Sequence, residues 1–418
     1  MWNGLATAAT KTRAKAVGHL DADCFYVSAE RVRDQFLREK PVGVLGNQGA
    51  CVIAKSYEMK AAGVATGEPI WDALAKCPTG IYLKRDFRWY EVLSRLMLEL
   101  VRELSPKVEY YSIDEFFFLA APGRGQTFQR LAESMRDRIF ERLGVPVTVG
   151  IARTRTLAKL ISDAAKPFGA LAVLDRDAEE GLLHERPVTE ITGIAGRRAA
   201  RLSPWNIRTC LDLARADRRL VRELLTATGE ALWWELNGDP VQPIHAERPL
   251  HKALSRGGSF GEATVDPGVL FAWLVRNLER LIEELEYHGV LAGRLTVWVS
   301  YKNGHVGLGQ SGLAVPSDRF DVLLDAARPC LRRAWLPRGS AQRMHLIAER
   351  LTPRRQAPLG LFCPPDPRAE VLAKLKRDVN ARHGRFTLRS GATLPLSHIY
   401  RDSANGYDIC DVRGKICF

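Results

Sequence analysis

The 418-residue sequence has little of what would place it in a membrane, a zinc site or a disulfide framework. No stretch approaches the roughly 20 apolar residues that span a bilayer. None of the eight cysteines forms a C-x-x-C pair, and no cysteine–histidine cluster has zinc spacing. The first residues contain no continuous apolar core, which argues against a secretory signal. We therefore expect a cytoplasmic protein with reduced thiols and no membrane partner.

No run of about five or six like charges is present either, so we expect no charged tail. Even so, 61 lysines and arginines against 48 acidic residues leave a net charge of +13, and the pI is about 9.5. Such a surplus attracts polyanions, of which nucleic acid is the commonest in the cytoplasm. The alternative is a proteome rich in arginine, and charge alone does not separate the two.

The composition, 46% hydrophobic and 26% charged, is that of an ordinary globular protein. At roughly 150 residues per domain, the length predicts two to four domains. Sequence patterns divide the chain into an α/β region, a helical region from about residue 175, a linker, and a second α/β region. The expected elements are a strand at 16–26, a hairpin at 40–58, a strand pair at 108–120, a helix at 126–143, a strand at 145–152, and a β-α-β-β-α-β unit at 253–351.

Two acidic clusters interrupt apolar strands. Asp21 and Asp23 lie in HLDADCFY, and Asp114 and Glu115 lie in YYSIDEFFF. Buried carboxylates are costly unless they are paired or bind a metal. Gathered at one sheet edge, they would repel one another, and a divalent cation would relieve that repulsion. Two Mg²⁺ ions bridged by carboxylates suit in-line displacement at a phosphate. The alternative is that these acids pair with some of the many lysines and arginines.

Four motifs in order carry a family resemblance: HLDADCFYVSAE, SYEMKAAGVATGEPI, EYYSIDEFFF and VGIARTRTLAKLISDAAKPFG. Together they resemble the Y-family of translesion DNA polymerases, the branch of bacterial polymerase IV and the polymerase V catalytic subunit. CVIAKSYEMKAAG and LSRGGSF are more similar to the polymerase V (UmuC-like) branch. The resemblance implies low-fidelity, template-directed DNA synthesis in damage tolerance, including the SOS response.

The resemblance also implies a multidomain α/β (α+β) fold shaped like a right hand. Palm and fingers would be followed by a helix–hairpin–helix thumb and a β-α-β-β-α-β little finger. The expected domains are a flexible extension at 1–17, the palm at 18–30 and 77–174, the fingers at 31–76, the thumb at 175–240, a linker at 241–252, the little finger at 253–355, a clamp-binding motif at 356–362 and a tail of unknown role at 363–418.

The family's metal ligands correspond to Asp21, Asp114 and Glu115, with the backbone carbonyl of Ala22 as a further ligand. They would hold two Mg²⁺ ions as cofactors. Asp23 matches an acid that supports the site in this family, and Ser112 would orient the loop before Asp114.

For the incoming dNTP, Tyr26 occupies the position whose ring excludes a ribose 2′-hydroxyl, with Phe25 packed beside it. The alternative for Tyr26 is a core aromatic residue. Tyr57 and Lys166 match residues that contact the triphosphate. Lys60 stands where relatives usually have arginine, which puts the triphosphate geometry in doubt. Lys60 is otherwise a solvated helix charge.

Primer–template DNA is the expected macromolecular partner. The turn from Gly193 to Gly196 resembles a helix–hairpin–helix, whose backbone amides hold a DNA phosphate, and Arg197 and Arg198 would extend that contact. The alternative is a simple helix cap. Arg256 and the strand 343–351 would lie on a little-finger sheet that grips the duplex.

Gln356, Leu359, Leu361 and Phe362 fit Q-x-x-L-x-L-F, a pattern that bacterial polymerases insert into the sliding clamp. The alternative is a tail folded onto its own core. An accessory polymerase V-type subunit and a recombinase filament are further possible partners. Two other functions stay open: a catalytically inactive Y-family adaptor between DNA and clamp, and another palm-fold enzyme such as a nucleotidyl cyclase.

Overall fold

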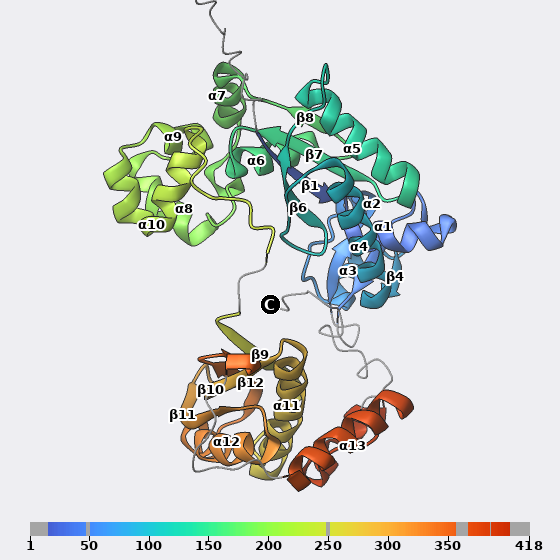
Figure 1. Cartoon of the computed structure of the whole chain (residues 1–418), viewed down its shortest axis with the longest axis vertical. Coiled ribbons are helices and arrows are strands. Elements are labelled where there is room, and N and C mark those ends of the chain that lie inside the picture. Colours follow the sequence, from blue (N-terminus) through green and yellow to red (C-terminus); the bar gives the residue numbers. More distant parts are fainter. Residues whose placement is uncertain (1–15, 47–50, 248–250, 357–366, 385, 402–418) are drawn as a thin grey trace, which may run out of the picture. The chain divides into compact units, whose positions relative to one another are not determined.

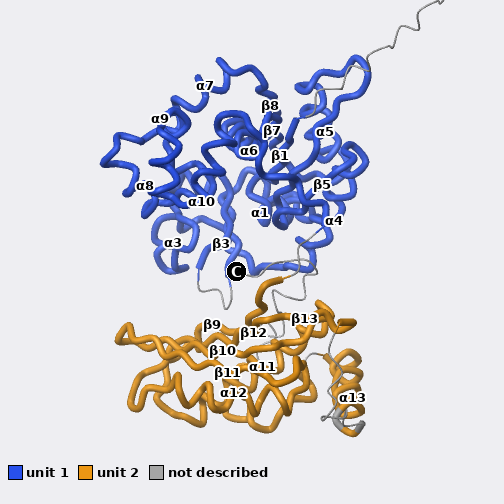
Figure 2. The backbone as a smooth tube through the Cα atoms, turned by 60° about the vertical axis from the view of Figure 1, so that its left-hand side comes forward, with its two compact units in different colours: residues 1–248, 411–418 blue, residues 249–410 orange. Residues whose placement is uncertain are grey.

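The computed structural model describes residues 16–46, 51–247, 251–356, 367–384 and 386–401. The chain forms two compact units, and the boundary between them in the sequence lies near residue 248 (Figure 2). In the described residues no helix is long and apolar enough to cross a bilayer.

Unit 1 is built on a five-stranded sheet in the order β5-β6-β1-β7-β8 (Figure 1). The strands are β1 (Ala16–Ala22), β5 (Val108–Tyr110), β6 (Glu115–Ala120), β7 (Val147–Ala152) and β8 (Ala170–Ala172). β1 lies in the middle, antiparallel to both β6 and β7, and all seven of its residues are buried. The predicted strand pair at 108–120 is confirmed as β5 and β6.

Helices α4 (Phe87–Leu104), α5 (Phe128–Leu143) and α6 (Arg155–Ala165) pack on this sheet, and α1 (Phe25–Arg33) packs on α4 and on the smaller sheet described next. Successive strand residues face opposite sides. Phe117 therefore packs with α6 on one side, and Phe116 and Phe118 fill the other. The sheet is consequently buried on both faces, and its polar residues must find partners inside the protein.

A smaller sheet has the order β3-β2-β4, with β2 (Val42–Leu45), β3 (Val52–Lys55) and β4 (Ile81–Lys84). The antiparallel β2–β3 pair confirms the predicted hairpin. β4 joins it in parallel, a pairing the sequence patterns did not predict. Helices α2 (Tyr57–Ala61) and α3 (Ile70–Lys76) complete this part, preceded by the short η1 (Gln35–Leu37).

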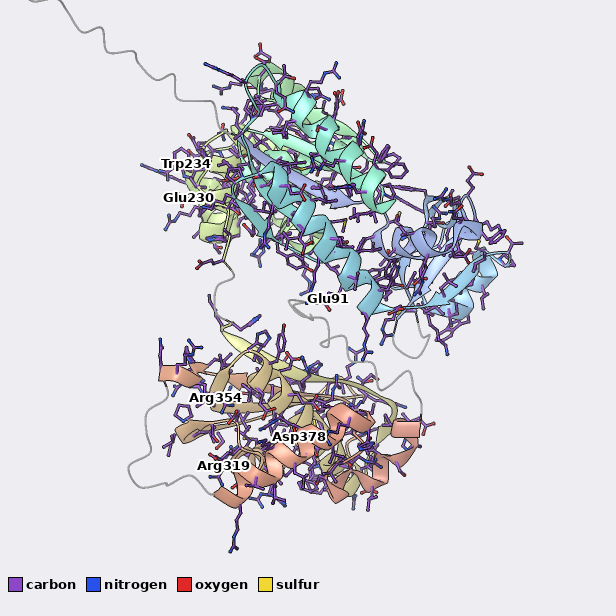
Figure 3. The ribbon with its side chains drawn as sticks, turned by 45° about the vertical axis from the view of Figure 1, so that its right-hand side comes forward. Glu91, Glu230, Trp234, Arg319, Arg354 and Asp378 are labelled. Carbon is purple, nitrogen blue, oxygen red and sulfur yellow. The ribbon has the colours of Figure 1, made fainter. Side chains whose placement is uncertain are left out.

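The predicted helical region begins with α7 (Arg176–Glu185) and η3 (Val188–Glu190), and continues with α8 (Gly196–Leu202), η4 (Ser203–Trp205), α9 (Cys210–Arg215) and α10 (Arg218–Leu236). α10 is kinked at Thr226, where φ is 67°. Across the kink, Arg218 and Arg222 both form ion pairs with Glu230, and the Arg218 guanidinium lies 5.5 Å from the Trp234 ring centroid. Glu230 and Trp234 both belong to the half of α10 that follows the kink (Figure 3). These contacts hold the two halves of α10 at an angle.

Unit 2 contains a four-stranded sheet in the order β11-β10-β12-β9. The strands are β9 (Ala253–Thr264), β10 (Val290–Tyr301), β11 (Val306–Ser317) and β12 (Ala341–Glu349), and the helices are α11 (Pro267–Tyr287) and α12 (Phe320–Ala334). This is the predicted β-α-β-β-α-β order. The two helices pack on one face of the sheet (Figure 1). β13 (Thr352–Pro353) pairs with the start of β10, and η5 (Arg354–Gln356) follows.

The tail contributes α13 (Pro367–His383), η6 (Gly391–Leu396) and α14 (Ser397–Arg401). Leu396 and Ile399 belong to the hydrophobic core of unit 2. The backbone amide of Ser390 donates to the buried Glu279 of α11 at 3.0 Å, and Lys376 of α13 pairs with the same carboxylate. The described part of the tail therefore packs on unit 2.

Candidate active site

The acidic residues meet at one end of the unit 1 sheet. The β1–β6 register places Asp21 directly opposite Glu115. In the turn before β6, the carbonyl of Asp114 accepts a hydrogen bond from the amide of Ala22 at 2.9 Å. The strand pairing thus brings together all four predicted metal-binding positions.

Two lysines from α6 and its C-terminal end lie on these carboxylates. Lys166 Nζ is 2.8 Å from Oδ2 of Asp21, and Lys159 forms an ion pair with Glu115. Burial raises the pKa of Asp21 to about 8, and the charges of Glu115 and Asp114 add to this rise although Lys166 opposes it. Added positive charge here therefore stabilises the ionised cluster.

Ser112 fixes the turn that carries Asp114 and Glu115. Its hydroxyl oxygen accepts from the amide of Glu115 at 3.1 Å, and the hydroxyl donates to the Asp114 carboxylate. The predicted role of Ser112 in orienting this loop agrees with these contacts.

Asp23 is held by protein groups from several elements. The Thr148 hydroxyl lies 3.1 and 3.0 Å from its two oxygens, and the amide of Phe168 donates at 2.7 Å. The Tyr57 hydroxyl is 3.5 Å away. Burial raises the pKa of Asp23. Asp23 therefore links β1 to β7, to α2 and to the loop after Lys166, which is a supporting position.

Tyr26 lies in the first turn of α1 within a group of aromatic rings. Its ring stacks on Tyr90 of α4, with centroids 4.6 Å apart and an angle of 16° between the planes. Phe87 meets the Tyr26 ring edge-on at 5.5 Å, and the neighbouring Phe25 lies 5.8 Å away. The packing of Phe25 beside Tyr26 agrees with the prediction. The sequence did not predict that Tyr90 and Phe87 would contact the Tyr26 ring.

The other predicted triphosphate contacts lie on α2. Tyr57 is 38% exposed, and Lys60 is exposed in the same helix. The pKa of Lys55 is lowered, first by burial and then by the charge of Lys60. Besides Lys60, Lys55 thus adds a second positive charge near α2 that the sequence patterns did not indicate.

The Gly193–Gly196 turn is exposed except for Ile194, which is buried. Gly193 has φ 95°, a conformation that favours glycine. The Arg198 guanidinium donates to the Gly193 carbonyl at 2.8 Å, and Arg197 is exposed. The turn therefore presents its backbone to solvent with arginines beside it.

In unit 2 the two faces of the sheet differ. Arg256 points to the helix face, where it is 7% exposed and forms an ion pair with Glu284 of α11. The other face, called the open face below, carries Trp298, Val306, Leu308, Arg343 and His345. Arg343 is exposed, and the His345 and Trp298 rings meet edge-on at 5.6 Å.

Comparisons with known proteins agree with this arrangement. Residues 20–163 match the impB/mucB/samB family, and residues 251–361 match that family's C-terminal domain. DNA polymerase IV 2 of Mesorhizobium japonicum is 34% identical over 290 residues, which cover 68% of this chain and 68% of that protein. Protein UmuC of Salmonella typhimurium is 28% identical over 384 residues, covering 88% of this chain and 91% of that protein. A Y-family DNA polymerase chimera of Dbh and Dpo4 has a similar fold, with TM-score 0.69, 23% identity, and coverage of 80% of this chain and 99% of that one.

The chain belongs to the impB/mucB/samB family of Y-family DNA polymerases. The family resemblance and the α/β multidomain fold are thereby confirmed. The polymerase is a DNA-directed enzyme of the translesion class, and the inactive-adaptor alternative is not favoured.

Membership in this family implies dependence on divalent metal in general. The polymerase offers carboxylate and carbonyl oxygens, the donors that Mg²⁺ prefers. Within the described ranges, no three histidine, cysteine, aspartate or glutamate side chains are already arranged to hold a metal ion. Lys159 and Lys166 lie on two of the three carboxylates instead. The donor set nevertheless fits a divalent cation such as Mg²⁺.

Two further residues of this site were missed. Lys159 lies in α6, and a single lysine within a helix carries no signal of its own in the sequence. His19, two residues before Asp21, is fully buried, and its Nδ1 lies 2.7 Å from the Ser162 hydroxyl. A polar residue in an otherwise apolar strand was the available signal for His19.

Proposed function

We propose that this polymerase joins a dNTP to the primer 3′-hydroxyl at the end of β1 and β6. The observation that carries this proposal is the cross-strand pair of Asp21 and Glu115, with Asp114 beside Ala22. Asp21, Asp114, Glu115 and the Ala22 carbonyl are assigned to two Mg²⁺ ions. When bound, such ions would activate the 3′-hydroxyl and neutralise the leaving pyrophosphate.

Lys166, Tyr57 and Lys60 are assigned to the triphosphate. Lys166 is 28% exposed at its side chain and already lies at Asp21, so its ammonium can turn from that carboxylate to a phosphate oxygen. Tyr57 extends from the N-terminal turn of α2, where Ser56 caps the helix. Tyr26, with Phe25 beside it, is assigned to excluding a ribose 2′-hydroxyl.

The domain assignment follows the elements. The five-stranded sheet corresponds to the palm, the β3-β2-β4 sheet with α2 and α3 to the fingers, and α7–α10 to the thumb. The sheet of unit 2 corresponds to the little finger. Because β4 (Ile81–Lys84) belongs to the β3-β2-β4 sheet, we extend the fingers beyond residue 76 to include it. The other domain limits expected from the sequence remain our proposal for this chain.

DNA is assigned to the Gly193–Gly196 turn, to Arg197 and Arg198, and to the open face of the little finger. A pocket of about 140 Å³ is lined by Tyr111, Lys159 and Thr192 among others, between the carboxylate turn and the Gly193 turn. Its position supports a primer strand that runs past Lys159. Arg256 stays a prediction as a DNA contact, and its burial against Glu284 favours Arg343 for that role.

The sliding clamp stays a proposed partner. Gln356 is exposed at the end of η5, whereas Leu359, Leu361 and Phe362 lie outside the described residues. Loss of clamp binding in a Leu361→Ala, Phe362→Ala variant, measured by gel filtration with purified clamp, would support the motif. The accessory subunit, the recombinase filament and a cytoplasmic location remain predictions.

Primer extension tests the proposed chemistry. The native polymerase with Mg²⁺ and four dNTPs should extend primers on undamaged and abasic templates, and the Asp114→Ala, Glu115→Ala double variant should not. Both proteins should bind primer–template DNA equally, because the acids lie outside the proposed DNA contacts. Extension that survives in the double variant would contradict the assignment of these acids.

A further inference from the structure

The ring of Tyr26 is backed by a second, fully buried ring. Tyr90 has no exposed surface, and its ring lies nearly parallel to that of Tyr26 at 4.6 Å. Phe87, 4% exposed, stands edge-on to both rings, 5.5 Å from Tyr26 and 5.9 Å from Tyr90. Stacked and edge-to-face contacts are the favourable aromatic geometries. Tyr26 therefore rests on a packed aromatic surface contributed by α4.

Tyr90 is itself fixed by a buried charge. Its hydroxyl donates to Glu30 Oε1 at 2.6 Å. Two nitrogens of Arg33 donate to the same carboxylate at 2.8 and 2.9 Å. Burial and the bond to Glu30 raise the pKa of Tyr90 above its ordinary value, so the hydroxyl keeps its proton and remains a donor. Because Glu30 is 4% exposed, these hydrogen bonds face little competition from water.

Two more contacts attach the start of α4 to α1. Arg33 also donates to Asp86 at 2.9 Å, and Asp86 caps the N-terminus of α4. The Trp89 indole donates to the Ala29 carbonyl at 2.7 Å. Together with the Tyr90–Glu30 bond, three polar links join the helix that carries Tyr26 to the helix that supports its ring.

A ring that excludes a 2′-hydroxyl works only if it cannot move aside. Discrimination between deoxyribose and ribose is a difference in transition-state free energy. A ring that yields would lower the penalty against ribose and leave the fit of deoxyribose unchanged. The rigidity of the surface behind Tyr26 thus bears on selectivity more than on the rate with the correct sugar.

We propose that Tyr90, with Phe87 at its edge, is a positioning residue that holds the Tyr26 ring against the sugar and thereby sets discrimination between dNTPs and rNTPs. The proposal rests on the proposed role of Tyr26. Tyr90 has no exposed surface with which to contact a nucleotide directly. Its effect on the sugar is therefore exerted through Tyr26.

The test is single-nucleotide primer extension by the full chain, with kcat/KM measured for a dNTP and the matching rNTP. Tyr90→Leu should lower the dNTP-to-rNTP ratio about three- to tenfold, the factor that the interaction energy of an aromatic pair corresponds to. The change should come from a higher kcat/KM for the rNTP. Tyr90→Phe, which keeps the stack and loses the bond to Glu30, should hold the ratio within about twofold.

Phe260→Leu is the matched control, since it removes one ring of a stacked pair with Trp273 in the other unit. It should leave the ratio unchanged. Tyr26→Ala distinguishes a failure of the proposed role of Tyr26 from a failure of the positioning role of Tyr90. If Tyr26→Ala lowers the ratio and Tyr90→Leu does not, the positioning role is overturned. If Tyr26→Ala leaves the ratio unchanged, the proposed role of Tyr26 fails and the positioning role with it.

A thermal melt shows whether each variant is folded. Should Tyr90→Leu fail to fold, Phe87→Leu takes its place because it removes only the edge contact. A lowered ratio in Phe87→Leu at unchanged dNTP kcat/KM would support the proposal. An unchanged ratio would overturn it.

Discussion

The charged residues at the carboxylate end of the unit 1 sheet are largely buried and paired, whereas the open face of the unit 2 sheet carries an exposed arginine. Asp21 lies in β1, a strand that is buried throughout, and Asp23 follows directly after it; both carboxylates are held by partners from other elements. In β12, exposed Arg343 and half-buried His345 alternate with fully buried Met344 and Leu346. One region fixes its charges in a single geometry, as catalysis requires. The other region presents exposed side chains at regular intervals along a strand, which suits contact with a repetitive polyanion.

The largest effect should come from a carboxylate in the fixed region. Asp21→Asn is expected to lower kcat of primer extension about 100- to 1000-fold, because it removes a charge that we assign to binding the catalytic metal ions. Asp163→Asn is the matched control: Asp163 also contacts Lys166, at 3.2 Å, but lies outside the cluster. A comparable loss in both variants would show that only the contact with Lys166 matters.

Arg256 and Arg343 allow the same comparison within unit 2, because Arg256 is a buried charge on the helix-covered face of the sheet whose open face carries Arg343. Arg256→Ala leaves the carboxylate of Glu284, whose side chain is only 12% exposed, without this partner and should lower the free energy of unfolding of unit 2 by about 3 kcal/mol. Arg343→Ala, on the open face, should change it by less than about 0.5 kcal/mol. Urea unfolding of the full chain measures both. Equal stabilities would contradict the distinction between the two faces.

For DNA binding, we expect Arg343→Ala to have the larger effect and Arg256→Ala the smaller. Arg343→Ala is expected to weaken primer–template binding and to reduce the salt slope of log K by about 1, as the loss of one phosphate contact does. The reduction should be the same for different sequences, since phosphate contacts carry no base information. Fluorescence anisotropy across a salt series provides the measurement. An unchanged slope would remove Arg343 from the proposed interface.

The smallest effect should come from an exposed ion pair of the tail. Arg377, 52% exposed at its side chain, pairs with Glu286, and Arg377→Ala should change the free energy of unfolding by less than about 0.5 kcal/mol. Glu279→Ala should cost more, about 1–3 kcal/mol, because it leaves the Ser390 amide without its acceptor. A larger effect of Arg377→Ala would mean that α13 is held mainly by surface charge.

Much of the fold could be predicted because the patterns involved are local. Alternation and turn residues indicated the β2–β3 hairpin, and the order of elements indicated the β-α-β-β-α-β unit of residues 253–351. The parallel pairing of β4 with β2 could not be predicted, since nothing in either short strand encodes a partner so far along the chain.

The candidate site shows the same division. Asp21, Asp114 and Glu115 stood out because acidic residues are rare within apolar strands. Tyr90 and Lys159 did not, because an aromatic residue or a lysine in an amphipathic helix is ordinary. Their importance comes from what lies opposite them, Tyr26 in one case and Glu115 in the other.

By itself, the sequence determined which chemical groups are present and which stretches form strands and helices, since periodicity and charge are properties of neighbouring residues. The residues of the four sequence motifs were also enough to indicate the Y-family. Only the tertiary structure decided that Asp21 lies opposite Glu115, that Arg256 is buried while Arg343 is exposed, and that Tyr90 supports Tyr26. Those facts depend on strand register and helix packing, which are set by the free energy of the whole core.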